Sequence, residues 1–317
     1  MITVRVARKA LEAQDICSFE LVAADGKPLP PFSAGSHIDV HLPGGIVRQY
    51  SLCNDPAETH RYVLGVLNDP ASRGGSKAMH EQVKEGDTLT ISEPRNHFAL
   101  THEAKRSLLF AGGIGVTPIL CMAERLAVMG SDFQMHYCGR SRERMAFVDR
   151  ISASSFASRV AVHVDDGAPE QKLDLAAALA KPQAGTHLYV CGPKGFMDAV
   201  LNTARSAGWP EEQLHYEFFS ADVVKSDADG SFEVKLASSG RVVTVPKDKT
   251  VIAALAEAGI DVPVSCEQGV CGTCLTRVIE GVPDHRDAYL TPEEKAANDQ
   301  FLPCCSRAKS ACLVLDI

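Results

Sequence analysis

The C-terminal part of the chain carries a group of closely spaced cysteines. The 317 residues include eleven cysteines, and five of them crowd together near the C-terminus: Cys266, Cys271, Cys274, Cys304 and Cys305. The first three have the spacing C-x4-C-x2-C, and Cys304 follows 30 residues after Cys274. Four thiolates at such a spacing can hold the two irons of a [2Fe–2S] cluster. Gly269 and Gly272 within the loop would let the backbone approach the inorganic sulfides closely.

A zinc site is the alternative interpretation of these cysteines. Zinc sites usually combine two C-x2-C pairs. This chain has a single short pair, Cys271 and Cys274, preceded by a gap of four residues. The pattern therefore favours an iron–sulfur cluster, and by spacing alone either Cys304 or Cys305 can supply the fourth ligand.

A second group of residues, RQYSL at positions 48–52, suits the binding of a flavin. Alternate residues of a strand share a face, so Arg48 and Tyr50 are neighbours, one for a phosphate and one for the ribityl chain and ring. Ser51 can offer a hydroxyl to the reactive N5 region. On its own the pentapeptide is equally compatible with an ordinary barrel strand.

The segment SRGGS at positions 72–76 supports the flavin site. It opens a helical stretch, and two glycines at a helix N-terminus expose backbone N–H groups and the positive end of the helix dipole. Both features suit a phosphate. A plain N-cap loop without a ligand is the alternative.

A glycine-rich turn, AGGIGVTPI at positions 111–119, suits a pyrophosphate. Gly112, Gly113 and Gly115 make a tight turn between a strand and a helix, and Pro118 lies in the first turn of that helix. The strand–turn–helix context favours a nucleotide site over a turn with no ligand.

The tripeptide CGP at positions 191–193 ends a later strand of the same region. Cys191 has no clearly placed His or Asp to activate it, which argues against a hydrolytic nucleophile. A buried, inert strand cysteine is the alternative to a role in binding the nucleotide. Arg140, Ser141 and Arg142 follow another strand, where the adenosine ribose is expected, and arginines there could accept a 2′-phosphate and favour NADPH.

The elements that must position these residues fall into three regions. Residues 1–102 show short strands punctuated by Gly and Pro, which predicts an antiparallel β-barrel. Residues 103–225 alternate strands with helical stretches, among them 143–151, and this predicts a parallel sheet covered by helices on both faces. A polar stretch at 225–231 indicates a linker, and residues 226–317 follow with a predicted hairpin, a helix at 250–258 capped by Thr250, and the cysteine group.

The composition of the chain argues against several classes of protein. The net charge of −8 argues against nucleic acid as a partner. Residues 226–317 contain 14 Asp and Glu against 9 Lys and Arg, which indicates either simple solvation or an acidic face that docks a basic protein. No stretch approaches the ~18 apolar residues that span a bilayer, and the N-terminal residues lack the apolar core of a signal peptide. We therefore expect no membrane association and a cytoplasmic location.

Residues 226–317 resemble a plant-type ferredoxin of the β-grasp fold. They are most similar to the C-terminal domain of the phthalate dioxygenase reductase family, which includes the reductase components of vanillate O-demethylases. CEQGVCGTC, PDHRD at 283–287 and the ending CCSRAKS…LVLDI carry this resemblance. In that family the fourth ligand is the cysteine followed by one residue and then Ser-Arg. The resemblance thus implies a [2Fe–2S] cluster held by Cys266, Cys271, Cys274 and Cys304.

The R-x-Y-S and R-G-G-S motifs resemble the flavin barrel of ferredoxin-reductase-type enzymes, and the phthalate dioxygenase reductase branch binds FMN. The resemblance implies FMN contacts from both segments: Arg48, Gln49, Tyr50, Ser51, Arg73, Gly74, Gly75 and Ser76. Phe219 aligns with an aromatic residue that stacks on the flavin, and a plain core aromatic is the alternative.

The G-G-x-G-x-T-P and C-G-P motifs resemble the nicotinamide domain of the same enzymes, and the family favours NADH over NADPH. The resemblance places Thr117 and Cys191 beside the nicotinamide and, with Ser51, makes them the expected catalytic residues. The remaining nucleotide contacts implied are Gly112, Gly113, Gly115, Pro118, Arg140, Gly192 and Pro193.

The resemblance covers essentially the whole chain and implies an oxidoreductase. We expect hydride transfer from NADH to FMN, and then single electrons through the cluster to a Rieske-type oxygenase that acts on an aromatic acid. A monomer is expected. A reductase for another acceptor, such as a cytochrome P450 or a non-Rieske monooxygenase, is the first alternative. A non-catalytic iron–sulfur or zinc module is the second.

Overall fold

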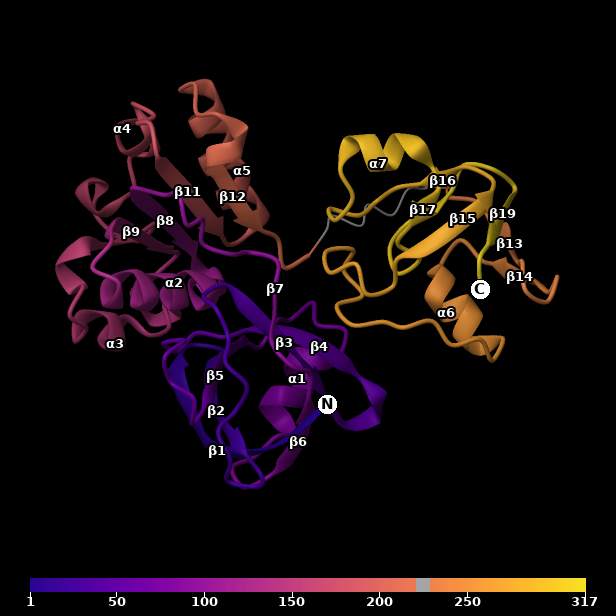
Figure 1. Ribbon diagram of the computed structural model, residues 1–317, viewed down its shortest axis with the longest axis horizontal. Helices are drawn as coiled ribbons and strands as arrows, with labels where there is room; N and C mark the ends of the chain where they lie inside the picture. The colour runs from indigo at the N-terminus through magenta and orange to yellow at the C-terminus, as the bar shows by residue number, and fades with distance from the viewer. Residues whose placement is uncertain (221–228) are drawn as a thin grey trace. The chain divides into compact units, whose positions relative to one another are not determined.

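The chain folds into two compact units. The computed structural model describes residues 1–220 and 229–317 (Figure 1). Its contacts divide the chain into Met1–Glu217 and Phe218–Ile317. The predicted linker at 225–231 is described only from Asp229 onward, and the predicted boundary between residues 225 and 226 lies outside the described residues.

The first unit begins with a seven-stranded antiparallel sheet in the order β4-β3-β6-β1-β2-β5, with β7 paired to β3. A bridge between Leu52, just after β4, and Leu64 of β5 brings the two ends of this order together. The sheet thus closes around an apolar core, as the predicted β-barrel requires. Its strands are β1 (Ile2–Ala13), β2 (Ile16–Ala23), β3 (Ser36–His41), β4 (Val47–Ser51), β5 (Tyr62–Leu67), β6 (Thr88–Ile91) and β7 (Arg95–Asn96).

The same unit continues into a five-stranded parallel sheet in the order β10-β9-β8-β11-β12. Its strands are β8 (Arg106–Gly112), β9 (Asp132–Gly139), β10 (Val160–Val164), β11 (Thr186–Cys191) and β12 (Leu214–Glu217). The helices that connect them are α2 (Val116–Val128), α3 (Val148–Ser152), α4 (Leu175–Leu179) and α5 (Lys194–Ser206), while α1 (Gly75–Glu81) belongs to the barrel region. The carboxyl ends of β8 and β11 are neighbours, where ligands of such sheets bind.

The helix predicted over residues 143–151 is interrupted in the structure. A 3-10 turn covers Arg142–Arg144, and α3 begins only at Val148, after Phe147 with a φ of 61°. Met145 explains the break, because it is buried beneath Gly139, where a Cβ would lie 2.4 Å from its Cγ. Packing of Met145 against the end of β9 therefore overrides the local helical preference.

The second unit is a mixed sheet with a helix beside it. Its strand order is β14-β13-β19-β15-β17, with the parallel pair β13 and β19 at the centre, and β16 pairs separately with β18. The predicted hairpin is present as β13 and β14, and Thr250 caps α6 by accepting from the Ala253 N–H at 3.2 Å. The elements are β13 (Phe232–Leu236), β14 (Val242–Val245), α6 (Val251–Glu257), β15 (Thr276–Glu280), β16 (Pro283–Asp284), α7 (Pro292–Ala297), β17 (Gln300–Phe301), β18 (Arg307–Ala308) and β19 (Cys312–Leu315).

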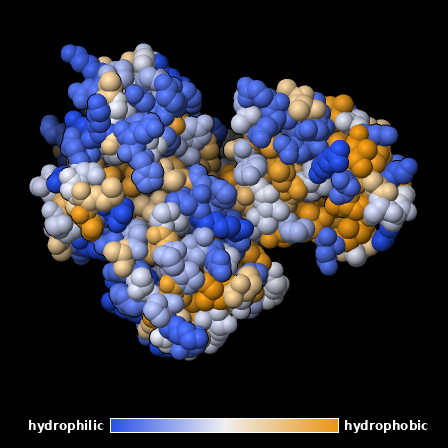
Figure 2. Space-filling view, in the orientation of Figure 1, coloured by the Kyte–Doolittle hydropathy of each residue, from blue (hydrophilic) through white to orange (hydrophobic). Residues whose placement is uncertain are grey.

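The surface is mixed in character. Figure 2 shows hydrophilic residues over most of the visible face of the first unit, and broader hydrophobic patches beside hydrophilic residues on that of the second. None of the helices in residues 1–220 and 229–317 combines the length and the apolar character needed to cross a bilayer.

Candidate functional site

The C-terminal cysteines lie in interacting pairs within the second unit. A hydrogen bond between the Cys266 and Cys271 thiols raises the pKa of Cys266 and lowers that of Cys271. A hydrogen bond with the Cys304 thiol raises the pKa of Cys274. Within the described residues, no three His, Cys, Asp or Glu side chains are spaced as ligands of a single metal ion. Two thiol pairs suit a [2Fe–2S] cluster, in which each iron takes two thiolates.

The backbone around these thiols also fits a cluster. The Gln268 N–H donates to Cys266 Sγ at 3.2 Å, and the Cys271 thiol donates to Thr273 Oγ1 at 3.3 Å. Gly269 and Gly272 both have a φ of 71°, and a Cβ on either would lie within 2.5 Å of a neighbouring side chain. The loop therefore needs glycine at both positions, and it offers N–H groups to sulfur as cluster sites do.

The two adjacent cysteines, Cys304 and Cys305, occupy different surroundings. Cys304 hydrogen-bonds with the Cys274 thiol and also with the Cys305 thiol, while Cys305 Sγ lies 3.7 Å from the Leu302 carbonyl oxygen and 3.8 Å from Ser306 Oγ. A Cβ on Gly269 would meet Cys305 Sγ at 2.5 Å. This arrangement favours Cys304 as the fourth ligand, which stays a prediction.

Strand β4 presents the RQYS residues on two faces. Its antiparallel register with β3 sets Tyr50 opposite Ile38 and Arg48 opposite Val40. Arg48 and Tyr50 therefore share one face, as the sequence predicted, and it is the face of the buried residues Ile38 and Val40. Ser51 and Gln49 lie on the other face.

Arg48 lies against the start of α1, the other predicted flavin segment. Its Nη2 donates to the Arg73 carbonyl at 3.1 Å, and a Cβ on Gly75 would lie 2.4 Å from Arg48 Cγ. Gly74 starts the helix with a φ of 93°, and Ser76 Oγ accepts from the Asp69 N–H at 3.2 Å. The structure thus brings the two flavin segments together, around a glycine that leaves room for the arginine.

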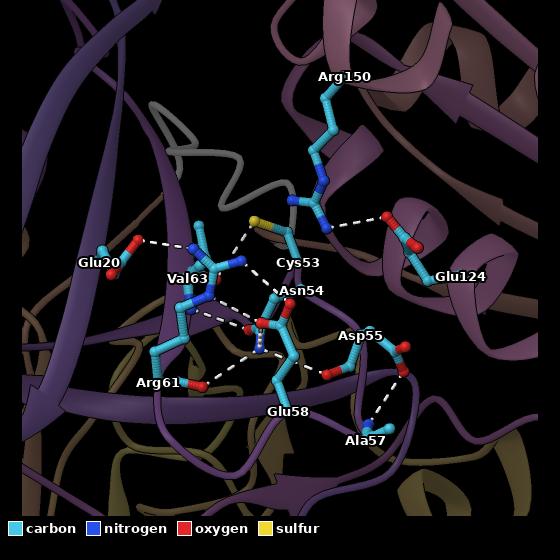
Figure 3. A network of polar contacts seen from close by, with 10 residues as sticks. All are labelled: Glu20, Cys53, Asn54, Asp55, Ala57, Glu58, Arg61, Val63, Glu124 and Arg150. Carbon is cyan, nitrogen blue, oxygen red and sulfur yellow. Dashed lines mark hydrogen bonds and ion pairs between the residues drawn. The ribbon is translucent and has the colours of Figure 1, made fainter. Parts of the chain in front are cut away.

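A polar network fixes the segment that follows Ser51 (Figure 3). Asn54 accepts from the Val63 N–H at 2.9 Å and donates to Glu58 Oε2 at 3.0 Å. Arg150 of α3 pairs with Glu124 of α2 at 2.9 Å and reaches toward the buried Cys53 thiol. Burial raises the pKa of Cys53 to about 12. The barrel segment and the helices of the parallel sheet therefore hold one another in register beside Ser51.

The two nucleotide motifs pack directly on each other. A Cβ on Gly115 would lie 2.3 Å from the Cys191 carbonyl oxygen, and one on Gly112 would lie 3.0 Å from Pro193 Cδ. Thr117 is buried, and its hydroxyl donates to the Ile114 carbonyl at 3.0 Å. Only glycine allows this close approach of the β8–α2 turn to the end of β11, where the sequence predicts the nicotinamide.

Glu217 is a candidate site residue that the sequence analysis did not identify. It ends β12 opposite Cys191, and its carboxyl lies within hydrogen-bonding reach of the Ser51 hydroxyl. Burial raises its pKa to about 8, and its Oε2 is buried without a hydrogen-bond partner in the described residues. Burial, and then the Glu217 charge, raise the pKa of Cys191. Ser51, Cys191 and Glu217 thus converge from the two sheets and leave a polar atom for a bound group.

Two further predicted contacts are not among these three residues. Arg140 is exposed at the carboxyl end of β9, where the adenosine ribose is expected. Phe219 is 38% exposed and falls in the second unit. Its predicted stacking on the flavin therefore stays a prediction.

Known proteins match the chain over its full length. The 2Fe–2S iron-sulfur cluster binding domain matches residues 234–309, and the N-terminal domain of the DmmA-like subunit of dimethylamine monooxygenase matches residues 91–214. A vanillate O-demethylase oxidoreductase from Pseudomonas sp. strain HR199 is 59% identical over 317 residues, which cover 100% of both chains. The solved structure of a phthalate dioxygenase reductase, described as modular for electron transfer from pyridine nucleotides to [2Fe–2S], superposes with a TM-score of 0.82. It is 40% identical, and the match covers 100% of this chain and 98% of that one.

The chain belongs to the phthalate dioxygenase reductase family. Family members are oxidoreductases, the electron-transfer components of oxygenase systems, and the phthalate dioxygenase reductases use FMN and NADH. The predicted fold class, with its antiparallel sheet, its parallel sheet and its ferredoxin-like region, is confirmed. So are the predicted reductase class and the predicted set of FMN, NADH and a [2Fe–2S] cluster.

A further solved structure contains this family's architecture as part of a longer chain. An intact type IV self-sufficient cytochrome P450 monooxygenase is 42% identical with a TM-score of 0.81, and the match covers 100% of this chain and 41% of that one. The phthalate dioxygenase reductase architecture therefore also occurs within a single chain described as a P450 monooxygenase.

Proposed function

We propose that this chain is the NADH-dependent reductase of a Rieske-type oxygenase that acts on an aromatic acid, with O-demethylation of vanillate as the first candidate reaction. The 59% identity to a vanillate O-demethylase oxidoreductase over the whole of both chains carries this proposal. Its location is cytoplasmic, and it acts as a monomer that meets the oxygenase as a separate protein.

We assign the binding of the three cofactors to three proposed domains. Residues 1–102 bind FMN, residues 103–225 bind NADH, and residues 226–317 hold the cluster. The antiparallel sheet, the parallel sheet and the cysteine loop fall in these ranges in that order.

The protein residues supply binding and orientation. A bound FMN would supply the exchange between hydride transfer from NADH and single-electron transfer, and a [2Fe–2S] cluster held by the cysteines would supply one-electron transfer. Arg48, beside the start of α1, binds the flavin phosphate. The turn at Gly112–Gly115 approaches the pyrophosphate and sets the end of β11 against it.

We assign the control of protons to three residues, Ser51, Cys191 and Glu217. Glu217, with its pKa raised to about 8 by burial, holds a proton at neutral pH and can donate it in a hydrogen bond. The Ser51 hydroxyl orients that carboxyl. Cys191 is buried with a raised pKa, so it stays a neutral thiol that packs against the nicotinamide rather than a nucleophile.

An anaerobic titration with NADH tests this function directly. The visible spectrum follows the flavin band, and low-temperature EPR follows the reduced [2Fe–2S] signal. We expect NADH to bleach the flavin and to produce the EPR signal in the same sample. A cluster that dithionite reduces but neither NADH nor NADPH reduces would refute the proposed path. A colourless purified protein would instead support the non-catalytic alternative.

The acceptor is tested by reconstitution. Purified vanillate O-demethylase oxygenase should receive electrons from NADH through this chain and release formaldehyde from vanillate. The likeness to a self-sufficient P450 favours a P450 as the second candidate acceptor. Turnover with a P450 and not with any Rieske oxygenase from the same source would make the P450 the first candidate acceptor.

A further inference from the structure

The segment PDHRD and the residues after it lie directly against the cysteine loop. The Ala288 N–H donates to the Gly269 carbonyl at 2.9 Å. A Cβ on Gly269 would lie 3.2 Å from Asp287 Cα, and one on Gly272 would lie 2.3 Å from the ring of Tyr289. Residues 287–289 therefore form one wall of the loop that carries three of the predicted ligands.

The Asp287 carboxylate is the centre of this wall. Its side chain is 0% exposed. Oδ2 accepts from the backbone N–H of Leu290 at 2.8 Å and of Tyr289 at 3.2 Å, and Oδ1 accepts from Ser306 Oγ at 3.4 Å. These hydrogen-bond neighbours are donors, as a carboxylate requires. Ser306 follows Cys304 by two residues, so Asp287 ties the wall to the segment that supplies the fourth predicted ligand.

The charges around Asp287 lie farther away than its hydrogen-bond partners. Lys295 Nζ is 3.7 Å from Oδ2 and donates to the Asp287 backbone carbonyl at 2.6 Å. His285 Nδ1 is 3.7 Å from Oδ1. The neighbouring Arg286 forms ion pairs with Asp229 and Asp284. Burying a carboxylate is costly unless its hydrogen bonds are made, and here they are made by the groups that shape the loop.

We propose that Asp287 is a positioning residue for the [2Fe–2S] cluster, holding residues 287–290 against the cysteine loop and fixing a negative charge beside it. This inference rests on the proposed function, because it requires the cluster. Reduction adds one electron to a site that already carries negative charge. A fixed carboxylate nearby disfavours the reduced form and so lowers the reduction potential.

Replacement of the charge at constant shape tests the proposal. Asp287→Asn keeps one acceptor oxygen and removes the charge. Asp316→Asn is the matched control, because Asp316 carries the same charge in the same unit and its side chain is 54% exposed in an ion pair with Arg277. Both variants and the parent chain are titrated with dithionite, with the midpoint potential read by EPR.

We expect a positive shift of the midpoint potential and altered g-values in Asp287→Asn, and parent values in Asp316→Asn. Parent values in Asp287→Asn, or equal shifts in both variants, would overturn the proposal. A parent chain without a [2Fe–2S] spectrum would instead refute the proposed function, because dithionite bypasses NADH and the flavin.

A second variant covers the case in which Asp287→Asn does not retain a cluster. Ser306→Ala removes the hydrogen bond to Asp287 Oδ1 and the one that Ser306 Oγ accepts from the Arg286 N–H at 3.1 Å, both of which join the Ser306 segment to residues 286–287, and it leaves the charge in place. We expect this variant to lose its cluster several-fold faster to an iron chelator, followed by the decay of the visible absorption. A rate of loss equal to that of the parent chain would overturn the positioning role.

Discussion

At the scale of single residues, the chemistry depends on polar side chains that are buried. Glu217 is the clearest case, since burial lifts its pKa from 4.5 to about 8. A carboxyl with a raised pKa binds its proton more tightly in the folded chain than in the unfolded one. The stability that it contributes is therefore fully present below about pH 4.5 and is lost as the pH rises through about 8.

The substitution Glu217→Gln should remove this pH dependence, because glutamine is neutral throughout. We expect the melting temperature of the parent chain to fall relative to that of the variant between about pH 5 and about pH 8. The NADH-driven bleaching of the flavin, followed by stopped flow, should slow by about 10²-fold in the variant. Glu103→Gln is the control, because Glu103 is exposed. Parallel melting curves for the parent chain and Glu217→Gln would contradict the raised pKa.

The two adjacent cysteines offer a second test at this scale. Cys304 interacts with both Cys274 and Cys305, while Cys305 lies against Gly269 and the Leu302 carbonyl and, within the described residues, hydrogen-bonds to no predicted ligand other than Cys304. Cys304→Ser should therefore abolish the [2Fe–2S] EPR signal of the dithionite-reduced protein, and Cys305→Ser should retain it. The reverse result would make Cys305 the fourth ligand.

The residues found from the sequence alone share one property, namely a motif with a fixed spacing. The cysteine loop, RQYS and the glycine-rich turn were found because a cofactor imposes that spacing. Glu217 belongs to no motif of fixed spacing. Its role arises because the parallel register sets it opposite Cys191 while Ser51 arrives from the other sheet. HYEFF offers only its phenylalanines as a signal, and Glu217, directly before them, belongs to no motif.

At the scale of elements, the close approach of two strand ends shapes the predicted nucleotide site. A Cβ on Gly115 would lie 2.3 Å from the Cys191 carbonyl oxygen and 2.6 Å from the Gly192 nitrogen. Both are backbone atoms of β11 and its turn, which cannot rotate away as a side chain can.

Gly115→Ala should therefore move the β8–α2 turn away from β11. We expect a loss of about 1–3 kcal/mol in the free energy of unfolding and a weaker binding of NADH. Gly195→Ala is the matched control, because a Cβ there meets nothing within 4 Å. Alanine within α5 should stabilise the helix by about 0.5–1 kcal/mol. Denaturant unfolding and NADH titration measure both effects, and normal NADH binding in Gly115→Ala would contradict the tight fit.

Hydrophobic periodicity predicted whether an element is a helix or a strand more reliably than it predicted where that element begins and ends. The alternation of strands and helices predicted the parallel sheet because each strand is an apolar run, such as β8 with six buried residues in seven. The prediction of one continuous helix at 143–151 was wrong, and its cause cannot be read from the periodicity of the sequence. Met145 is drawn under Gly139 by tertiary packing, and Phe147 takes a left-handed φ to allow it.

At the scale of the whole molecule, charge is unevenly distributed along the chain. Residues 226–317 carry 14 acidic and 9 basic side chains, against a net charge of −8 for all 317 residues. More than half of the excess acid therefore belongs to the region with the cysteine loop. Simple solvation and attraction of a basic surface on the acceptor protein both account for this excess.

Ionic strength separates these explanations. Salt screens charges on separate molecules, with a Debye length of about 10 Å at 0.1 M and about 3 Å at 1 M. If the acidic region docks the oxygenase, the KM for oxygenase should rise several-fold between low and high salt, measured as NADH oxidation at saturating NADH. The single-turnover reduction of the cluster within the chain is the control and should change little, because no second protein takes part. A KM that does not respond to salt would assign the acidic residues to solvation, and the contact would then have to rest on uncharged groups beside the cysteine loop, of which Tyr289, 40% exposed, is one.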